Sequence, residues 1–404
     1  VNVGVDGLRV RSANFEMIGG SVHNLHDYRL TTWISLDAFA KNAKVQGVTV
    51  NVHGTTGSIG GAGSVFDGNI IRNGTLQVTA ANVTITGNNG TTNDWVRNVT
   101  QRYIDVQNAN CLAAGNTLNG ESTVTTAASN TNDGTSSTTG IYLTGASSTG
   151  FVAGPNQISA TANAIEAHSS FVGTATFSGG RYYSTDLVHN SNNESCRFAA
   201  GNGANITIQG VTFDALTKSD EVWFGGTSSA KYTVKNCEVL CEMEFDAALT
   251  TASTVEGNNF ADGTQAVDFA DAGTRIINND FALAPTLTGA LLYTRDNRVA
   301  GSAITSVALA ANQDNYAWPI TDTVVFTTTG TNNYAITGVV ARAPGSIINV
   351  VNGDAADNVT ISHDVTSTDA NRFNVNVGSD AVYGPDDDGS YIATGGVNTG
   401  WSGN

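Results

Sequence analysis

Residues 195–299 repeat one pattern four times: CRF (196–198) with NITIQGV (205–211), VWF (222–224) with YTVKNC (232–237), MEF (243–245) with TVEGNNF (254–260), and VDF (267–269) with RIINNDF (275–281). Each copy has a short strand with one residue between two apolar ones, then a loop, then a second strand that leads into a Gly or Asn turn. The turn residues Gly210, Asn236, Gly257 and Asn278 are 26, 21 and 21 positions apart. This near-constant period, with strand alternation and without helical periodicity, is typical of a solenoid.

Short strands joined by sharp bends predict a parallel β-helix. Such strands cannot bury an apolar face as an isolated hairpin, whereas stacked coils share one interior. Gly and Asn suit the bends because both tolerate the left-handed backbone conformation that a sharp corner requires. We expect inward residues of neighbouring coils to stack in a ladder that contains Val211, Cys237, Phe260 and Phe281.

The composition limits the classes of partner. Charged residues make up 13% of the 404 residues, and the formal net charge is -17. Nucleic acid and anionic membrane surfaces are therefore not expected as partners, since both bind through clustered Lys and Arg. No apolar run is long enough to span a membrane, so no membrane insertion is expected. The four cysteines lack a C-x-x-C pair and are expected to be buried thiols: Cys111, Cys196, Cys237 and Cys241.

The pattern divides the chain into four parts. Residues 1–30 are expected to form an entry segment that caps the open end of the solenoid. Residues 31–300 are expected to form the parallel β-helix, with roughly ten to twelve coils and one lateral loop at 116–140. Residues 301–312 read as a linker, and residues 313–404 predict a small antiparallel β-domain.

The C-terminal part contains a series of short motifs, namely NYAWP (315–319), ITG (336–338), IINVVN (347–352), TISH (360–363), NRF (371–373) and a final Trp401. Their order and spacing over about 90 residues resemble a module that recurs in the tail spike and fibre proteins of tailed bacteriophages. The resemblance implies a right-handed parallel β-helix in an extracellular virion protein. It also implies a homotrimer that contacts other virion tail proteins and binds a host surface glycan during host adsorption.

The candidate site lies on the first strand of each coil, where the middle residue points outward between two inward apolar ones. The column of these residues is expected to contain Ser35, Gln77, Asp105, Tyr142, Glu166, Arg197, Trp223, Glu244, Asp268 and Leu292. Its middle is polar and aromatic. Neighbouring outward positions on the same strands add His168, Glu221, Glu242 and Asp246.

Glu244 and Asp268 form the candidate catalytic pair. Adjacent coils would place their carboxyl groups about 5 Å apart, near the separation found in retaining glycosidases. Trp223 offers a flat apolar face to a sugar ring, and Arg197 offers a fork for a carboxylate or sulfate of an acidic glycan. The other expected substrate contacts are Glu166, Tyr142, Glu242 and Asp246.

The carboxylates of the column have two other interpretations. Glu242, Glu244, Asp246 and Asp268 could hold Ca²⁺, because hard cations take oxygen ligands and like charges this close otherwise repel one another. No other metal and no organic cofactor is expected. An acidic solenoid could also expose carboxylates on every face, in which case the column is ordinary solvated surface.

The sequence thus favours a phage tail spike or fibre protein that recognises host cell-surface polysaccharide, with its cleavage by a glycosidase or lyase activity left open. One alternative is a polysaccharide hydrolase or lyase proper, which predicts that Glu244→Gln or Asp268→Asn abolishes product formation. Another is a structural virion fibre or capsid decoration protein without glycan binding, in which the column tolerates substitution.

Overall fold

The computed structural model describes residues 6–23, 32–92, 101–120, 138–160, 162–185, 194–219, 221–227, 229–264, 267–330, 332–340, 343, 349–353, 357, 359–362 and 390–393. Within these ranges the chain forms strands, turns and bends, and no helix. In that part of the chain there is accordingly no helix that could cross a membrane. The all-β class expected from the sequence is confirmed for the described residues.

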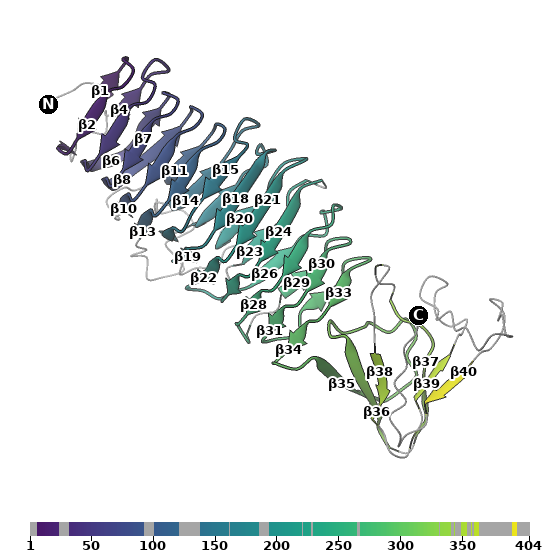
Figure 1. The fold of residues 1–404 in the computed structure, drawn as a ribbon. Helices are drawn as coiled ribbons and strands as arrows, with labels where there is room; N and C mark the ends of the chain where they lie inside the picture. The colour runs from purple at the N-terminus through teal and green to yellow at the C-terminus, as the bar shows by residue number, and fades with distance from the viewer. Residues whose placement is uncertain are drawn as a thin grey trace, which may run out of the picture.

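Most strands lie in three parallel stacks along the axis of an elongated rod (Figure 1). Stack 1 contains β1 (Asp6–Val10), β4 (Thr32–Leu36), the second parts of β6 (Thr49–Ile59) and β8 (Ile70–Val78), β11 (Gln101–Val106), β14 (Thr138–Leu143), β17 (Ile165–Ala167), β20 (Cys196–Phe198), β23 (Val222–Phe224), β26 (Met243–Phe245), β29 (Val267–Phe269) and β32 (Thr286–Leu287).

Stack 2 contains β2 (Glu16–Ile18), β5 (Lys44–Gln46), β7 (Val65–Asp67), β9 (Thr84–Thr86), β12 (Leu112–Ala114), β15 (Phe151–Ala153), β18 (Thr174–Ser178), β21 (Asn205–Gln209), β24 (Lys231–Lys235), β27 (Thr254–Glu256), β30 (Arg275–Ile277) and β33 (Tyr293–Arg295). Stack 3 contains β3 (Ser21–His23), the first parts of β6 and β8, β10 (Asn89–Thr92), β13 (Thr117–Gly120), β16 (Gln157–Ala160), β19 (Arg181–Ser184), β22 (Thr212–Ala215), β25 (Glu238–Val239), β28 (Asn259–Phe260), β31 (Asp280–Phe281) and β34 (Arg298–Val299).

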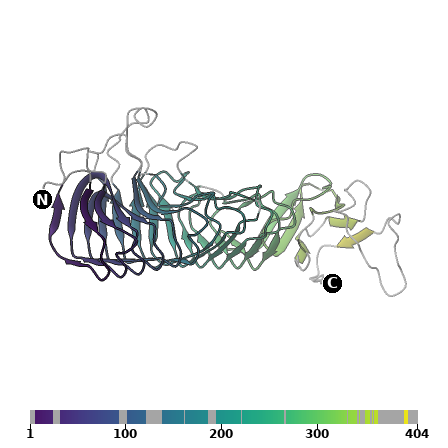
Figure 2. The same ribbon diagram turned by 90° about the horizontal axis from the view of Figure 1, so that it is seen from above.

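The chain visits the stacks in the order 1, 2, 3 and then returns to stack 1, so that one strand from each stack forms a coil. Successive coils follow one another from the N-terminal end toward the C-terminal strands (Figure 2). Every strand pair within the three stacks is parallel. This arrangement is solenoid-like, and it puts residue i of one coil beside its counterpart in the next.

Apolar side chains fill the space between the stacks in one continuous cluster. On stack 1 the rings of Phe198, Phe224, Phe245 and Phe269 stack at centroid distances of 4.9, 4.6 and 5.3 Å. Offset stacks of this kind stabilise a core beyond the area that they bury. The coils therefore share one interior, as the repeat predicted.

The ladder predicted on stack 3 is half right. Phe260 and Phe281 do stack, at 4.6 Å, but the residues that precede them in this ladder are Phe213 and Val239. Val211 and Cys237 lie two positions earlier and occupy the corner between stacks 2 and 3. The error arose because apolar residues at the corner and on the strand look alike in the sequence.

At this corner a left-handed Gly, Asn or Asp is followed by a buried Asn in six coils, and Pro155 precedes the buried Asn156 in a seventh. The left-handed residues include Gly87, with φ 60°, and Asn278, with φ 52°. The Asn residues form two hydrogen-bonded ladders, one with Asn69, Asn88, Asn116 and Asn156 and the other with Asn258, Asn279 and Asn297. Each amide thereby satisfies buried backbone groups of neighbouring coils. These ladders were not predicted from the sequence.

The expected entry cap and lateral loop are only partly described. Strand β1 already pairs with β4 in stack 1, so residues 6–10 belong to the first coil rather than to a separate cap. Residues 1–5 and 24–31 lie outside the described part of the chain. Of the predicted loop at 116–140, residues 117–120 and 138–140 belong to β13 and β14, and residues 121–137 are not described.

The C-terminal strands form two small sheets around a second buried cluster that includes Trp318 and Phe326. One sheet contains β35 (Ile304–Leu309), β36 (Thr323–Thr328) and β38 (Asn349–Asn352), and the other contains β37 (Tyr334–Ile336), β39 (Val359–Ser362) and β40 (Ser390–Ala393). Strand β35 occupies half of the segment 301–312 and pairs with β36, so the prediction of a linker there was wrong.

The prediction of an antiparallel domain was also wrong for three of the four strand pairs described there. The pairs β35–β36, β36–β38 and β37–β39 are parallel, and only β39–β40 is antiparallel. Parallel neighbours need a crossover of about a dozen residues, which the segment 310–322 provides. Of the motifs that carry the phage resemblance, residues 344–348, 363–389 and 394–404 lie outside the described residues.

Candidate functional site

The outward column of stack 1 is confirmed over eight coils. Consecutive strands pair residue by residue through Gln77, Asp105, Tyr142, Glu166, Arg197, Trp223, Glu244 and Asp268. Two positions differ from the prediction. Ser58 lies between Ser35 and Gln77, because β6 is long enough to contribute to two coils. Thr286 follows Asp268, whereas Leu292 is fully buried.

Arg197 and Trp223, both half-buried, form the centre of this column. The guanidinium carbon of Arg197 lies 5.4 Å from the centroid of the Trp223 ring, a favourable cation–π geometry. The indole lies against Gly225, since a Cβ atom at residue 225 would be 2.1 Å from the ring. Nη1 of Arg197 is also 3.8 Å from Oε2 of Glu194. Glu194 and the column neighbours Glu166 and Glu244 outnumber this single cation, so a neutral sugar suits this position better than an anionic one.

Beside this centre, Glu221 and Glu244 form a carboxyl pair. Burial, the negative charge of Glu244 and a hydrogen bond between the two side chains raise the pKa of Glu221 to about 8. Glu242 and Glu194 add further negative charge around it. At neutral pH Glu221 is therefore largely protonated and donates to Glu244. A carboxyl group that keeps its proton at neutral pH beside a second carboxyl group is an arrangement suited to acid–base chemistry.

The predicted pair Glu244 and Asp268 does lie on adjacent strands, β26 and β29. However, the carboxyl group that forms a hydrogen bond with Glu244 is that of Glu221. Oδ1 of Asp268 is buried and has no hydrogen-bond partner within the described part of the chain. The sequence contained a signal for Glu221, because Glu221 and Glu242 both directly precede the first strand of a coil. In the structure the two segments are neighbours, since Val222 N–H donates to Glu242 O at 2.8 Å.

Two other predicted contacts are engaged within the protein. Tyr142 is only 4% exposed, and the guanidinium carbon of Arg102 lies 3.6 Å from its ring centroid, so its ring cannot stack on a ligand. This prediction was wrong because a residue earlier on β11 reaches over the ring. Asp246 accepts the N–H of Ala248 at 2.7 Å and shapes its own turn. Glu166 and Glu242 lie half-buried beside the centre, as expected.

The Ca²⁺ alternative has no geometric support in the described residues, where no group of three or more His, Cys, Asp or Glu side chains is arranged to hold a metal ion. The cysteines are free, buried thiols, as predicted. Burial raises the pKa of Cys237 to about 11, so this thiol is not a nucleophile at neutral pH.

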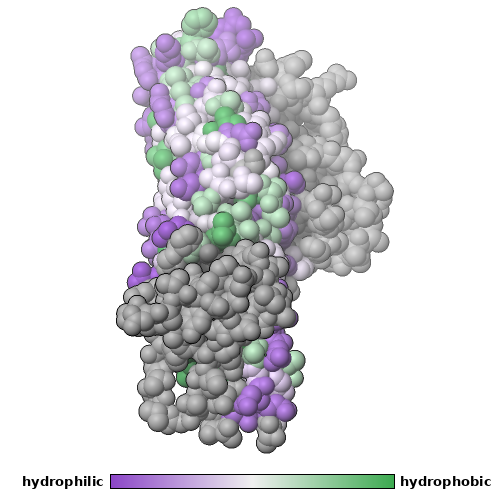
Figure 3. Space-filling model, turned by 90° about the vertical axis from the view of Figure 1, so that its right-hand side faces the viewer, coloured by the Kyte–Doolittle hydropathy of each residue, from purple (hydrophilic) through white to green (hydrophobic). Residues whose placement is uncertain are grey.

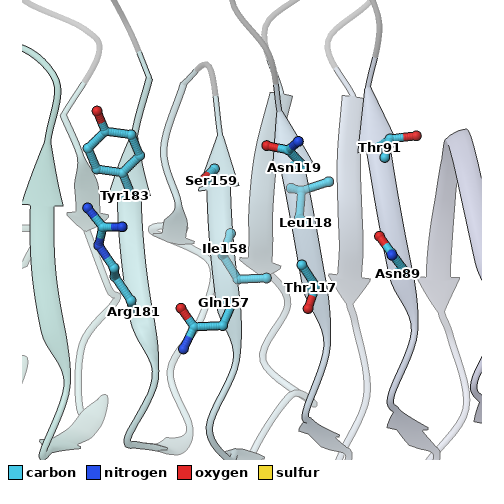
Figure 4. Close-up of a pocket in the computed structure, with 10 residues that line it drawn as sticks. All are labelled: Asn89, Thr91, Thr117, Leu118, Asn119, Gln157, Ile158, Ser159, Arg181 and Tyr183. Atoms are coloured by element: carbon cyan, nitrogen blue, oxygen red, sulfur yellow. The ribbon is translucent and has the colours of Figure 1, made fainter.

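A groove on stack 3 was not predicted. Its volume is about 340 Å³, and outward side chains of β10, β13, β16 and β19 line it in two rows (Figure 4). The lining residues are Asn89, Thr91, Thr117, Leu118, Asn119, Gln157, Ile158, Ser159, Arg181 and Tyr183. The sequence signal was polar alternation in strands that are far apart in the chain, which by itself does not distinguish a groove from ordinary surface.

No protein-family model matches the sequence, and no curated protein is significantly similar to it. The structure defines an all-β protein with long parallel sheets, a column of acidic and aromatic side chains on one stack, and a polar groove on another.

Proposed function

We propose that residues 6–299 form a closed, right-handed parallel β-helix in a tail spike or fibre protein of a tailed bacteriophage. In this proposal the protein is part of the extracellular virion, contacts other tail proteins and recognises a host cell-surface polysaccharide. The ordered return of the chain to each stack supports the architecture. The C-terminal motifs support the context, and the half-buried polar and aromatic residues at the middle of the stack 1 column support the ligand.

The observation that carries the ligand proposal is the contact of Arg197 with Trp223, at 5.4 Å, beside a carboxyl pair. An indole ring covers the apolar face of a pyranose, while carboxylates accept hydrogen bonds from its hydroxyl groups. Successive coils repeat every 4.8 Å or so, which lets neighbouring sugar units meet neighbouring strands. A neutral stretch of polysaccharide along stack 1 fits this surface.

A glycan array with the full chain tests this proposal. We expect binding to at least one bacterial surface polysaccharide and loss of that binding in Trp223→Ala. The matched control is Tyr293→Ala on stack 2, where the ring lies 4.6 Å from the guanidinium carbon of Arg275. Silence of the folded protein on a broad array, or equal binding by both variants, would favour the structural fibre or decoration protein instead.

The carboxyl pair favours a second function, cleavage of the bound glycan. Glu221 would act as the general acid that protonates the leaving oxygen, and Glu244 would act as the base or nucleophile. The wild-type protein is expected to release new reducing ends from the glycan. The variants Glu221→Gln and Glu244→Gln should lose this release while they still bind the glycan. Asp268→Asn tests the pair predicted from the sequence. Binding without release would leave a receptor-binding protein without depolymerase activity.

We further propose that three copies associate through stack 2. One outward row of this stack has no charged residue over eight coils: Val65, Thr84, Leu112, Val152, Thr176, Thr207, Thr233 and Thr254. Copies that each carry a charge of -17 repel one another less where such uncharged rows meet than where charged rows meet. On the face seen in Figure 3, strongly apolar residues are scattered among polar ones and form no large patch.

A further inference from the structure

We propose that the groove on stack 3 is a binding site for an acidic polysaccharide, which lies along the rod between Arg72 and Arg181. This goes beyond the proposed function, because it places a second binding site on stack 3 and assigns it an acidic glycan, whereas stack 1 binds a neutral one. It rests on the proposed function only in taking a carbohydrate as the ligand.

The groove is built from side chains that have unused hydrogen-bonding groups. In the described part of the chain, its six neutral polar side chains form no side-chain hydrogen bond; they are Asn89, Thr91, Thr117, Asn119, Gln157 and Ser159. The pairing of β10 with β13 and of β13 with β16 aligns these side chains in two rows. One row contains Asn89, Thr117 and Gln157, and the other contains Thr91, Asn119 and Ser159. Unpaired amides and hydroxyls at regular spacing match the hydroxyl groups of an extended glycan.

One end of the groove carries Arg181 and Tyr183. The guanidinium carbon of Arg181 lies 4.7 Å from the Tyr183 ring centroid, and Nη2 donates to Asp214 at 2.7 Å. Lys218 contacts the other oxygen of Asp214. Burial raises the pKa of Asp214, but the hydrogen bonds from Lys218 and Arg181 outweigh it and lower the pKa below its usual value. One carboxylate thus neutralises one of two cations, and this end keeps a net positive charge.

The other end carries Arg72. Arg72 pairs with Thr91 across β8 and β10, is exposed, and has no ion-pair partner among the described residues. Four strand steps separate Arg72 from Tyr183, which amounts to about 19 Å along the axis. No Asp or Glu lines the groove, although the chain as a whole is strongly acidic. Two cations at the ends of a neutral polar groove select an extended chain of about four sugar units with carboxylate or sulfate groups.

The experiment measures affinity for labelled oligosaccharides of polygalacturonate, alginate, hyaluronan and heparin, and for neutral cello-oligosaccharides of the same length. The variants are Arg72→Gln, Arg181→Gln and Ser159→Trp, which fills the groove. The matched control is Arg275→Gln, because Arg275 also stacks on a tyrosine but lies on stack 2. Light scattering of each variant checks that folding and oligomeric state are unchanged.

We expect at least one acidic probe to bind and the neutral probe not to bind at the groove. Loss of one charge-assisted contact in either Arg→Gln variant should weaken binding about tenfold, and Ser159→Trp should abolish it. The Arg275→Gln control and Trp223→Ala should retain wild-type affinity for the acidic probe. Failure of every acidic probe, or binding that survives all three groove variants, overturns the assignment. Acidic-probe binding that is lost only in Trp223→Ala would overturn it and leave the proposed stack 1 site in place.

Discussion

Replacement of Asn88 by alanine should destabilise the middle of the rod by about 3–5 kcal/mol. The Asn88 side chain makes four hydrogen bonds at 2.8–3.0 Å: it accepts from the backbone and side-chain amides of Asn69 and donates to Phe66 O and to Asn116 Oδ1. All of these groups are buried, so no water replaces the lost partner. Asn69 Nδ2 keeps its bond to Val45 O, and Asn116 Oδ1 keeps the backbone N–H of Asn88. Two buried groups therefore lose their side-chain partner, Asn69 N–H and Phe66 O, and a cost of about 1–3 kcal/mol for each places the expected loss near 3–5 kcal/mol.

The opposite test adds an asparagine to a ladder, through the variant Cys237→Asn. Cys237 occupies the ladder position just before Asn258, and its N–H already donates to Asn258 Oδ1 at 2.8 Å. Its thiol lies 3.9 Å from Ile208 O, the place where an asparagine amide would donate. An asparagine here extends the second ladder by one coil, so we expect a loss of less than about 1.5 kcal/mol, as for a volume-conserving replacement.

Hydrogen exchange is the right assay, because a stack of coils opens locally and one global unfolding energy is not defined for it. A loss of about 4 kcal/mol corresponds to roughly thousandfold faster exchange of the amides around β7, β9 and β12. Asn89→Ala is the matched control, since Asn89 is exposed and should change exchange little. Exchange in Asn88→Ala within tenfold of wild type would refute the view that the ladder stabilises the coils.

Three further outcomes follow from buried carboxyls and from stack 2. Burial raises the pKa of Asp271 to about 6; the folded state therefore keeps a proton that the unfolded state has lost, and stability falls as the pH rises from about 4 to 6. Asp271→Asn should flatten this part of the pH profile of amide protection in β29 and β30, after correction for intrinsic exchange, and an unchanged slope would contradict the assignment. Glu244→Gln should lower the pKa of Glu221, followed by carbon NMR of labelled glutamate, by about one unit, while burial keeps it above the usual value; no change would show that the two groups do not interact. If the proposed trimer forms through stack 2, Thr207→Asp should convert it to monomer in light scattering, whereas Thr212→Asp on stack 3 should not. A stable Thr207→Asp trimer would exclude stack 2 as the contact.

Local alternation explains what the sequence could predict of the rod. In the segment VWF the two apolar residues must point inward, so Trp223 must point outward, and the next coil repeats the rule with MEF. The column of stack 1 followed from this rule wherever a strand had three clear residues. It failed at Leu292, because the last coil uses Thr286–Leu287 and has no apolar pair around the outward residue.

Features that depend on contacts between distant segments were not predictable. The Asn ladders contradict the rule that interiors are apolar, and only the stacking of several Gly-Asn or Asn-Asn corners makes a buried amide favourable. The pKa of Glu221 depends on burial and on Glu244, which is on a different strand. Parallel pairing of β35 with β36 could not be read from strand patterns, since the same alternation serves either direction.

The division of charge between the stacks bears on how the two proposed sites can coexist on one acidic rod. Arg197 on stack 1 is surrounded by carboxyl groups, so an anionic chain gains little there, whereas the groove between Arg72 and Arg181 has no carboxylate in its lining. At physiological salt the Debye length is about 8 Å; contacts at the groove therefore act at nearly full strength while more distant carboxylates are screened. At low salt the repulsion from a net charge of -17 extends further and slows the approach of a polyanion. Capture of an acidic glycan should accordingly be fastest at intermediate ionic strength, and a neutral glycan on stack 1 should show no such maximum.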